Sequence, residues 1–132
     1  MTLRGNIAGE GILRNIVLVA AAFIMTALTA IPASADTITW RIRSKYPYKL
    51  HMEFYSQNRD VSWPGGGRVY VLKDSRFHTY RLNCRRGETI CYGAWVTTNQ
   101  DRWWGVGAYN TRRCSSCCYR CGQRTRNITL TR

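Results

Sequence analysis

The stretch Lys49-Leu50-His51-Met52-Glu53-Phe54-Tyr55 decides the fold class. Its apolar residues Leu50, Met52 and Phe54 occupy every second position, which is the period expected of a β-strand with one buried face. The other four residues of the stretch are expected on the solvent-facing side. Residues 49–55 therefore predict a half-buried strand rather than a helix.

Short runs rich in β-branched and aromatic residues recur along the chain, which is typical of further strands. They lie at 38–43, 68–72, 78–82, 89–96, 103–106 and 127–130. Turn signals rich in Gly, Asn and Asp separate them, and no segment after residue 35 keeps apolar residues at helical spacing over three turns. The expected fold is all-β, a small antiparallel sandwich or barrel of about seven short strands.

The first 35 residues have the pattern of a secretory signal peptide. Residues 1–14 are mildly basic, residues 16–31 are uncharged and largely apolar, and Ala33-Ser34-Ala35 offers small residues at a cleavage site. The alternative is an uncleaved anchor, although sixteen residues fall just below the roughly 17–25 needed to span a bilayer. We expect a signal at 1–35, a single cysteine-rich β domain at 36–132 without a transmembrane segment, and a secreted or periplasmic location.

Six cysteines follow the predicted leader, and an even number in a short exported chain favours a framework of three disulfides. They are Cys84, Cys91, Cys114, Cys117, Cys118 and Cys121. Cys84 and Cys91 flank an expected hairpin turn in a geometry that does not favour a direct bond between them. At least one of the two is expected to reach the 114–121 cluster, and adjacent Cys117 and Cys118 should take different partners.

The cluster also allows a thiolate metal site or a reactive dithiol, because it contains two C-x-x-C pairs. The two pairs adjoin with no residue between them, so they do not easily approach one tetrahedral ion from opposite sides. A thioredoxin-type centre needs a strand-helix-strand unit, which the sequence lacks. Structural disulfides with no metal and no cofactor are therefore the preferred interpretation, and a metal-binding or thiol-redox protein is the alternative.

The predicted mature domain is strongly basic. Arg4, Arg14 and Glu10 lie in the leader, so 18 of the 20 Lys and Arg residues and 6 of the 7 Asp and Glu residues remain, a formal charge of +12. An exported polycation meets anionic envelope glycans, lipid headgroups or extracellular polyanions rather than intracellular nucleic acid. A merely solvated, soluble surface explains much of the same charge without any partner.

Aromatic residues near arginines supply the candidate ligand-binding residues. Trp103 and Trp104 are adjacent, so on a strand they face opposite sides and one is expected at the surface. An exposed tryptophan can stack on a sugar while Arg102, Arg112 and Arg113 hold its anionic groups. The competing interpretation is that Trp95 and one of the pair fill the core, while the other tryptophan covers a sheet edge.

The residues for acid–base catalysis are few. The chain has only two histidines, His51 and His78, and His51 is two residues from Glu53 on the expected polar face of one strand. A small hydrolase would require His51, Glu53 and His78 to converge. The sequence therefore favours a non-enzymatic binding module over an enzyme.

Several motifs together resemble a group of small exported bacterial proteins for which no activity is known. They are Phe54-Tyr55-Ser56-Gln57, Trp63-Pro64-Gly65-Gly66-Gly67, Cys91-Tyr92-Gly93-Ala94-Trp95 (CYGAW), Trp104-Gly105-Val106-Gly107 (WGVG) and the CxxCCxxC cluster at 114–121. The resemblance covers most of the predicted mature chain. It implies a bacterial source and an exported domain, and it implies no catalytic or binding residue.

Overall fold

The computed structural model describes residues 35–132. The predicted signal peptide therefore lies outside the described residues, apart from Ala35, which opens the first strand. Within residues 35–132 no helix is long and apolar enough to cross a membrane.

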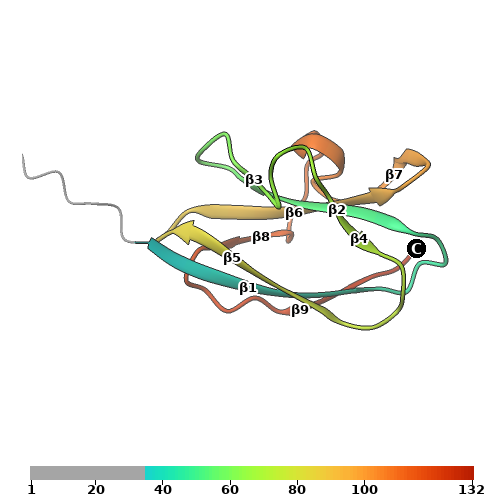
Figure 1. The fold of residues 1–132 in the computed structure, drawn as a ribbon, viewed down its shortest axis with the longest axis horizontal. Coiled ribbons are helices and arrows are strands. Elements are labelled where there is room, and N and C mark those ends of the chain that lie inside the picture. Colours follow the sequence, from blue (N-terminus) through green and yellow to red (C-terminus); the bar gives the residue numbers. More distant parts are fainter. Residues whose placement is uncertain (1–34) are drawn as a thin grey trace, which may run out of the picture. The chain divides into compact units, whose positions relative to one another are not determined.

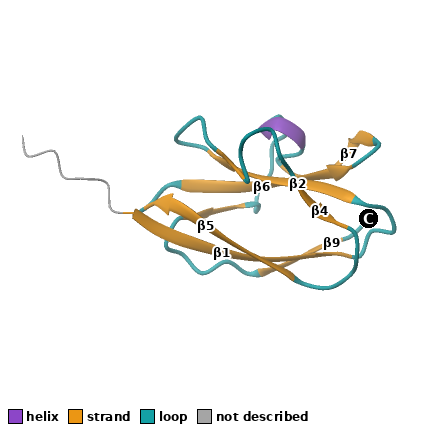
Figure 2. Cartoon of the chain, in the orientation of Figure 1, coloured by secondary structure: helices purple, strands orange, loops and turns teal. Residues whose placement is uncertain are grey.

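Strands dominate the described chain, with one short 3-10 helix between two of them (Figure 2). In chain order the elements are β1 (Ala35–Ser44), β2 (Leu50–Ser56), β3 (Ser62–Trp63), β4 (Tyr70–Leu72), β5 (His78–Arg85), β6 (Thr89–Val96), β7 (Asn99–Gly105), η1 (Ala108–Asn110), β8 (Cys118–Arg120) and β9 (Asn127–Leu130). All seven predicted strands are present, and the short β3 and β8 were not predicted. β7 begins at Asn99, ahead of the predicted strand at 103–106, and Asn99 pairs with Val96.

The strands form two sheets that face each other, which confirms the predicted sandwich (Figure 1). The smaller sheet has the order β5-β1-β9. The larger has the order β3-β2-β6-β7, with β4 also paired to β2 and β8 to β6. Pairing is antiparallel except between β1 and β9, which run parallel. The chain therefore returns at its end to the sheet in which the described part begins.

The core lies between the sheets and follows the predicted alternation. Leu50, Met52 and Phe54 of β2 are fully buried, and they meet the buried face of β1. Trp40 of β1 is the largest fully buried side chain, and its ring lies 5.1 Å from Phe54 and 5.3 Å from Tyr119, centroid to centroid. Aromatic rings at such separations add specific contacts to the burial of a large apolar surface.

The expectation that the other face of β2 stays in water was wrong for two residues. Glu53 and Tyr55 are only 7% and 8% exposed, because residues 105–110 fold back over the larger sheet. Glycines permit this close approach: a Cβ on Gly93 would lie 2.1 Å from the carbonyl oxygen of Gly107. The glycines of the CYGAW and WGVG motifs therefore pack one chain segment on another.

The connection from β5 to β6 is not the predicted hairpin. β5 belongs to the smaller sheet and β6 to the larger, so this turn carries the chain across the sandwich. The Glu88 carboxylate, 4% exposed as a residue, lies inside the turn. It accepts hydrogen bonds from Arg59 (2.6 and 3.0 Å), the Ser56 hydroxyl (2.6 Å) and the Arg85 backbone N–H (2.8 Å).

These contacts determine the ionisation of Glu88. Burial by itself would raise the pKa of this carboxyl, but the hydrogen bonds from Arg59, Arg85 and Ser56 outweigh it and hold the pKa at about 2. The ion pair joins the loop after β2 to the sheet-crossing turn.

All six cysteines are paired, which confirms the disulfide framework. The bonds are Cys84–Cys121, Cys91–Cys118 and Cys114–Cys117. Both Cys84 and Cys91 reach the C-terminal cluster, and Cys117 and Cys118 take different partners, as predicted. Cys91 and Cys118 are register partners on β6 and β8, whereas Cys84–Cys121 ties β5 of one sheet to the segment after β8 of the other.

We expect the non-reduced protein, purified without reductant, to have an intact mass six hydrogens below that of the reduced chain, because three disulfides are present. Alkylation of the native protein should add no mass. Peptide mapping should recover the three pairs named above, and a linked 84–91 peptide would contradict this fold.

Replacing the buried carboxylate, in the variant Glu88→Gln, should lower the free energy of unfolding by about 2 kcal/mol, because charged hydrogen bonds in the turn are lost. The folded pKa lies below the ordinary 4.5. The contribution of Glu88 is therefore complete above about pH 4.5 and declines as the pH falls towards 2. Urea unfolding should show a steeper loss between pH 5 and 2 in the wild type than in Glu88→Gln.

A matched control for that measurement is Asp60→Asn, which removes an exposed carboxylate from the loop that carries Arg59. Asp60→Asn should leave the acid dependence of stability as in the wild type. Equal pH profiles for Glu88→Gln and the wild type would disprove the assigned role of the ion pair.

Candidate functional site

The outward face of β1 is basic and rich in hydroxyl groups. Ile38, Trp40 and Ile42 point into the core, so the residues between them, Thr39 and Arg41, are turned outward and are exposed. Thr37 and Arg43 continue the same face and are half-buried. One strand thus presents two guanidinium groups and two hydroxyls at alternate positions.

The neighbouring strands extend this face through their register. Arg41 is the register partner of Thr79 on β5 and of Asn127 on β9, and Thr39 is the partner of Arg81. The outward residues of the two neighbours are Thr79, Arg81, Asn83 and Arg85 on β5 and Asn127 and Thr129 on β9. No outward position of these three described strands holds Asp or Glu.

An aromatic ring holds two of the arginines in place. The guanidinium carbons of Arg41 and Arg43 lie 4.7 and 4.4 Å from the centroid of the Phe77 ring. Arg43 Nε also donates a hydrogen bond of 3.0 Å to Thr129 Oγ1. Cation–π contact and this hydrogen bond restrict the two side chains before any ligand arrives.

We name the set Arg41, Arg43, Phe77, Arg81 and Arg85 the basic face. Strands lie about 4.8 Å apart and outward residues on one strand about 6.6 Å apart, so its charges form a grid on an open sheet surface. Guanidinium groups stay charged throughout the physiological pH range and bind carboxylate, sulfate or phosphate with paired donors. Such a surface can hold several anionic groups of an extended polymer at once.

The predicted ligand-binding residues fall into separate groups in the structure, and Trp103 and Arg112 form one of them. Trp103 is 39% exposed, and the guanidinium carbon of Arg112 lies 4.2 Å from the centroid of its ring. Arg112 also approaches the Asp101 carboxylate at 3.9 Å, which offsets part of its charge. Arg113 is exposed.

Trp104 and Arg102 lie on the face of β7 opposite to Trp103, and both approach Tyr46. Trp104 is half-buried, packs against Tyr46 at 5.1 Å between ring centroids, and donates its indole N–H to the Thr131 carbonyl at 2.5 Å. The guanidinium of Arg102 lies 5.6 Å from the same Tyr46 ring. The five predicted residues therefore do not form one site, and within this set only Trp103 and Arg112 contact each other closely.

The cysteine cluster brings three sulfur atoms close together. Those of Cys91, Cys117 and Cys118 all lie within 4.8 Å of one another. Each belongs to a disulfide in this structure. Zinc and copper bind thiolates, so a metal would require two of these bonds to be reduced first.

The residues proposed for a hydrolase do not converge. His51 and Glu53 lie on β2 of the larger sheet, whereas His78 lies on β5 of the smaller one. His78 instead contacts the Asp74 carboxylate at 2.8 Å. This hydrogen bond, with those from Arg76, lowers the pKa of Asp74 to about 2.

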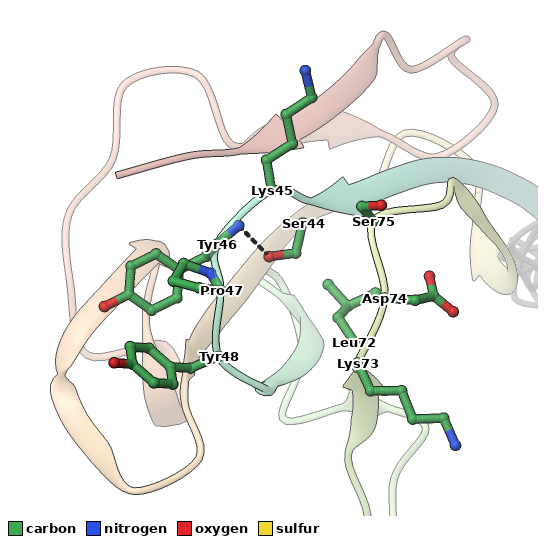
Figure 3. A pocket seen from close by; sticks show the side chains of 9 residues that line it. All are labelled: Ser44, Lys45, Tyr46, Pro47, Tyr48, Leu72, Lys73, Asp74 and Ser75. Carbon is green, nitrogen blue, oxygen red and sulfur yellow. Dashed lines mark hydrogen bonds between the residues drawn. The ribbon is translucent and has the colours of Figure 1, made fainter.

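A small pocket of about 290 Å³ lies between the chain after β1 and the chain after β4. Figure 3 shows its two lysines, Lys45 and Lys73, pointing away from each other and away from the hollow. Their charges are not gathered on one ligand position. This pocket therefore does not form an anion site.

Comparison of the chain with protein-family models, curated proteins and solved structures found no match. The case for a function therefore rests on the geometry of the chain itself.

Sequence reasoning missed the basic face, although a signal for it was present. The run Thr37-Ile38-Thr39-Trp40-Arg41-Ile42-Arg43 already alternates outward polar and inward apolar residues. The sequence did not reveal that β5 flanks this strand and adds Arg81 and Arg85 to the same surface.

The two adjacent tryptophans should respond differently to truncation. Trp104→Ala removes core packing and the bond to Thr131, and should lower the free energy of unfolding by about 2 kcal/mol or more. Trp103→Ala removes a ring on the outer surface and should change it by less than about 1 kcal/mol. Urea denaturation of both variants tests this assignment, and equal losses would refute it.

Proposed function

We propose that this protein is an exported, non-enzymatic binding module that holds an extended anionic polymer of the bacterial envelope, an acidic glycan, on its basic face. The observation that carries the proposal is the array of four arginines on a sheet surface without acidic residues, two of them fixed on Phe77. A formal charge of +12 after the predicted leader favours the approach of such a polymer.

Its shape favours a polymer over a small anion. The arginines are spread along β1 and β5 on an open surface, so an extended chain reaches more of them than a single sulfate or phosphate can. Threonine and asparagine side chains between them offer hydrogen bonds to sugar hydroxyls.

A glycan is favoured over a lipid surface for a second reason. Peripheral membrane binding usually adds the insertion of apolar side chains to electrostatic attraction. Phe77 is the only large apolar side chain of the basic face, and its ring is occupied by two guanidinium groups. The face is therefore better suited to a hydrated polyanion.

The disulfides support a secreted or periplasmic location, because such bonds persist in oxidising compartments. They also cross-link a small domain whose burial of apolar surface is limited by its size. In the proposed role the cysteines are structural and take no part in binding.

Retention on heparin, measured over a salt gradient, tests the proposal with two variants of equal charge. Arg41→Gln/Arg81→Gln removes two charges from the basic face, and Arg112→Gln/Arg113→Gln removes two from the region that the sequence analysis favoured. The first should reduce the slope of log affinity against log salt by about 2, since each lost contact removes about one from the slope.

The second variant controls for net charge and should bind nearly as the wild type does. Equal weakening in both would mean that overall charge, rather than the basic face, holds the polymer. A loss only in Arg112→Gln/Arg113→Gln would move the site to Trp103. Phospholipid vesicles of matched charge, if bound more tightly than heparin and polygalacturonate, would favour a membrane over a glycan.

A further inference from the structure

A larger pocket, of about 590 Å³, lies on the outer side of the larger sheet, and its properties differ from those of the basic face. Its floor is formed by β2 and β6, and its walls by the loop before β4, the β6–β7 turn and η1. Figure 1 shows that loop and η1 rising from the side of the larger sheet that faces away from β1. The lining residues used below are His51, Glu53, Tyr55, Trp95 and Tyr109.

Glu53 is the central residue of this pocket. Its Oε2 accepts a hydrogen bond of 2.6 Å from the Tyr55 hydroxyl. That hydroxyl itself accepts the Tyr109 backbone N–H at 2.9 Å, so its single proton is directed to Glu53. Burial, together with the Glu53 carboxylate, raises the pKa of Tyr55 well above its usual value, so Tyr55 remains a donor.

The other carboxylate oxygen, Oε1, is free. Among residues 35–132 it has no hydrogen-bond partner, and no Lys, Arg or His nitrogen lies within 4.0 Å of the Glu53 carboxylate. The other buried carboxylate of the described chain, Glu88, is neutralised by Arg59. Oε1 is open to the pocket, because Trp40 Nε1 is the only side-chain polar atom of residues 35–132 that is both fully buried and unpartnered. A carboxylate oxygen that opens into a pocket and has no cationic neighbour attracts a cation supplied from outside.

Aromatic rings line the space beside this carboxylate. Tyr109 is 69% exposed and stacks over Trp95, with ring centroids 6.2 Å apart. His51 meets the same indole edge-on at 6.0 Å. Tyrosine and tryptophan faces attract organic cations, and they do so more strongly where water is displaced.

The backbone beneath Tyr109 is held in an uncommon conformation. Tyr109 and Asn110 both have a φ of 57°, in the left-handed region that residues with bulky side chains rarely adopt. Strain of this kind persists where surrounding contacts impose it, and it concentrates at ligand sites. Here the contact is the hydrogen bond to Tyr55, which connects the position of the Tyr109 ring to the Glu53 carboxylate.

We infer that this pocket binds the primary ammonium group of a small ligand, an amino sugar or a lysine-type side chain. The free Oε1 of Glu53 accepts an ammonium N–H, and the exposed Tyr109 ring, supported from beneath by the buried Trp95, offers an aromatic face to the cation. A quaternary ammonium group is less suited, because it has no N–H to donate. The inference is independent of the basic face, which attracts charge of the opposite sign.

Titration calorimetry or amide NMR with D-glucosamine and with D-glucose tests the inference on the wild-type protein. The two sugars differ in one ammonium group, and glucosamine should bind about 10-fold to 100-fold more tightly, because a charged hydrogen bond is gained. Nα-acetyl-lysine amide distinguishes a peptide source of the ammonium from a sugar source. Equal affinity for glucose and glucosamine, or no saturation by either amine below about 10 mM, would overturn the inference.

The matched variant is Glu53→Gln, which keeps the size of the side chain and an acceptor for Tyr55. It should lose the preference for glucosamine and should melt at about the same temperature, because Oε1 has no hydrogen-bond partner among residues 35–132 to lose. A lower melting temperature with unchanged binding would show that Glu53 is structural.

Asn110→Gly provides the control for strain. It removes the side-chain hydrogen bonds between Asn110 and Gln57 and lets the backbone keep its left-handed conformation without strain, so glucosamine binding should be retained. The salt dependence of binding distinguishes the two surfaces. Added NaCl should weaken heparin binding strongly. It should weaken amine binding far less, because NaCl also screens the repulsion between the amine and the net positive charge of the protein. A parallel loss of both would contradict two separate sites.

Discussion

The turn at residues 85–88 is the constraint on which the rest of the sandwich depends. Consecutive strands of a small β domain usually pair, but here β5 and β6 separate at this turn and enter opposite sheets. Inside this turn Glu88 accepts hydrogen bonds from Arg85 and, across the fold, from Ser56 and Arg59. The backbone of Cys121 exchanges hydrogen bonds with residues 87 and 88. Cys84–Cys121 then joins the same two sheets covalently. The position of β6, and with it the larger sheet, follows from this corner.

The two outer faces of the sandwich differ because different parts of the chain cover them. On the outward side of β1 the Phe77 ring contacts Arg41 and Arg43, but Thr39 and Arg41 stay exposed and the guanidinium groups remain available. The corresponding side of β2 is covered by residues 105–110, which Gly93 allows to approach closely. That cover encloses Glu53 and turns a strand surface into a pocket. One sandwich thus carries an open cationic surface and an enclosed anionic one.

Local patterns predicted the elements well, and contacts between distant segments explain the errors. The alternation at 49–55 and the crowding of cysteines at 114–121 are local, and the core face of β2 and the disulfide links to the cluster followed from them. Glu53 and Tyr55 were placed in water because nothing in their own strand reveals the segment at 105–110 that covers them. The basic face was missed for a related reason: Arg41 and Arg81 meet only through the β1–β5 register.

The choice of arginine over lysine on the basic face has a consequence for regulation. Arg41, Arg43, Arg81 and Arg85 carry no primary amine, so acylating agents that neutralise lysine cannot reduce the charge there. Their charge also does not titrate between an acidic and a neutral environment. A cell could therefore not switch this surface off by acetylation or by a change in pH. Ionic strength remains as the external control, because dissolved salt screens these charges whatever the pH.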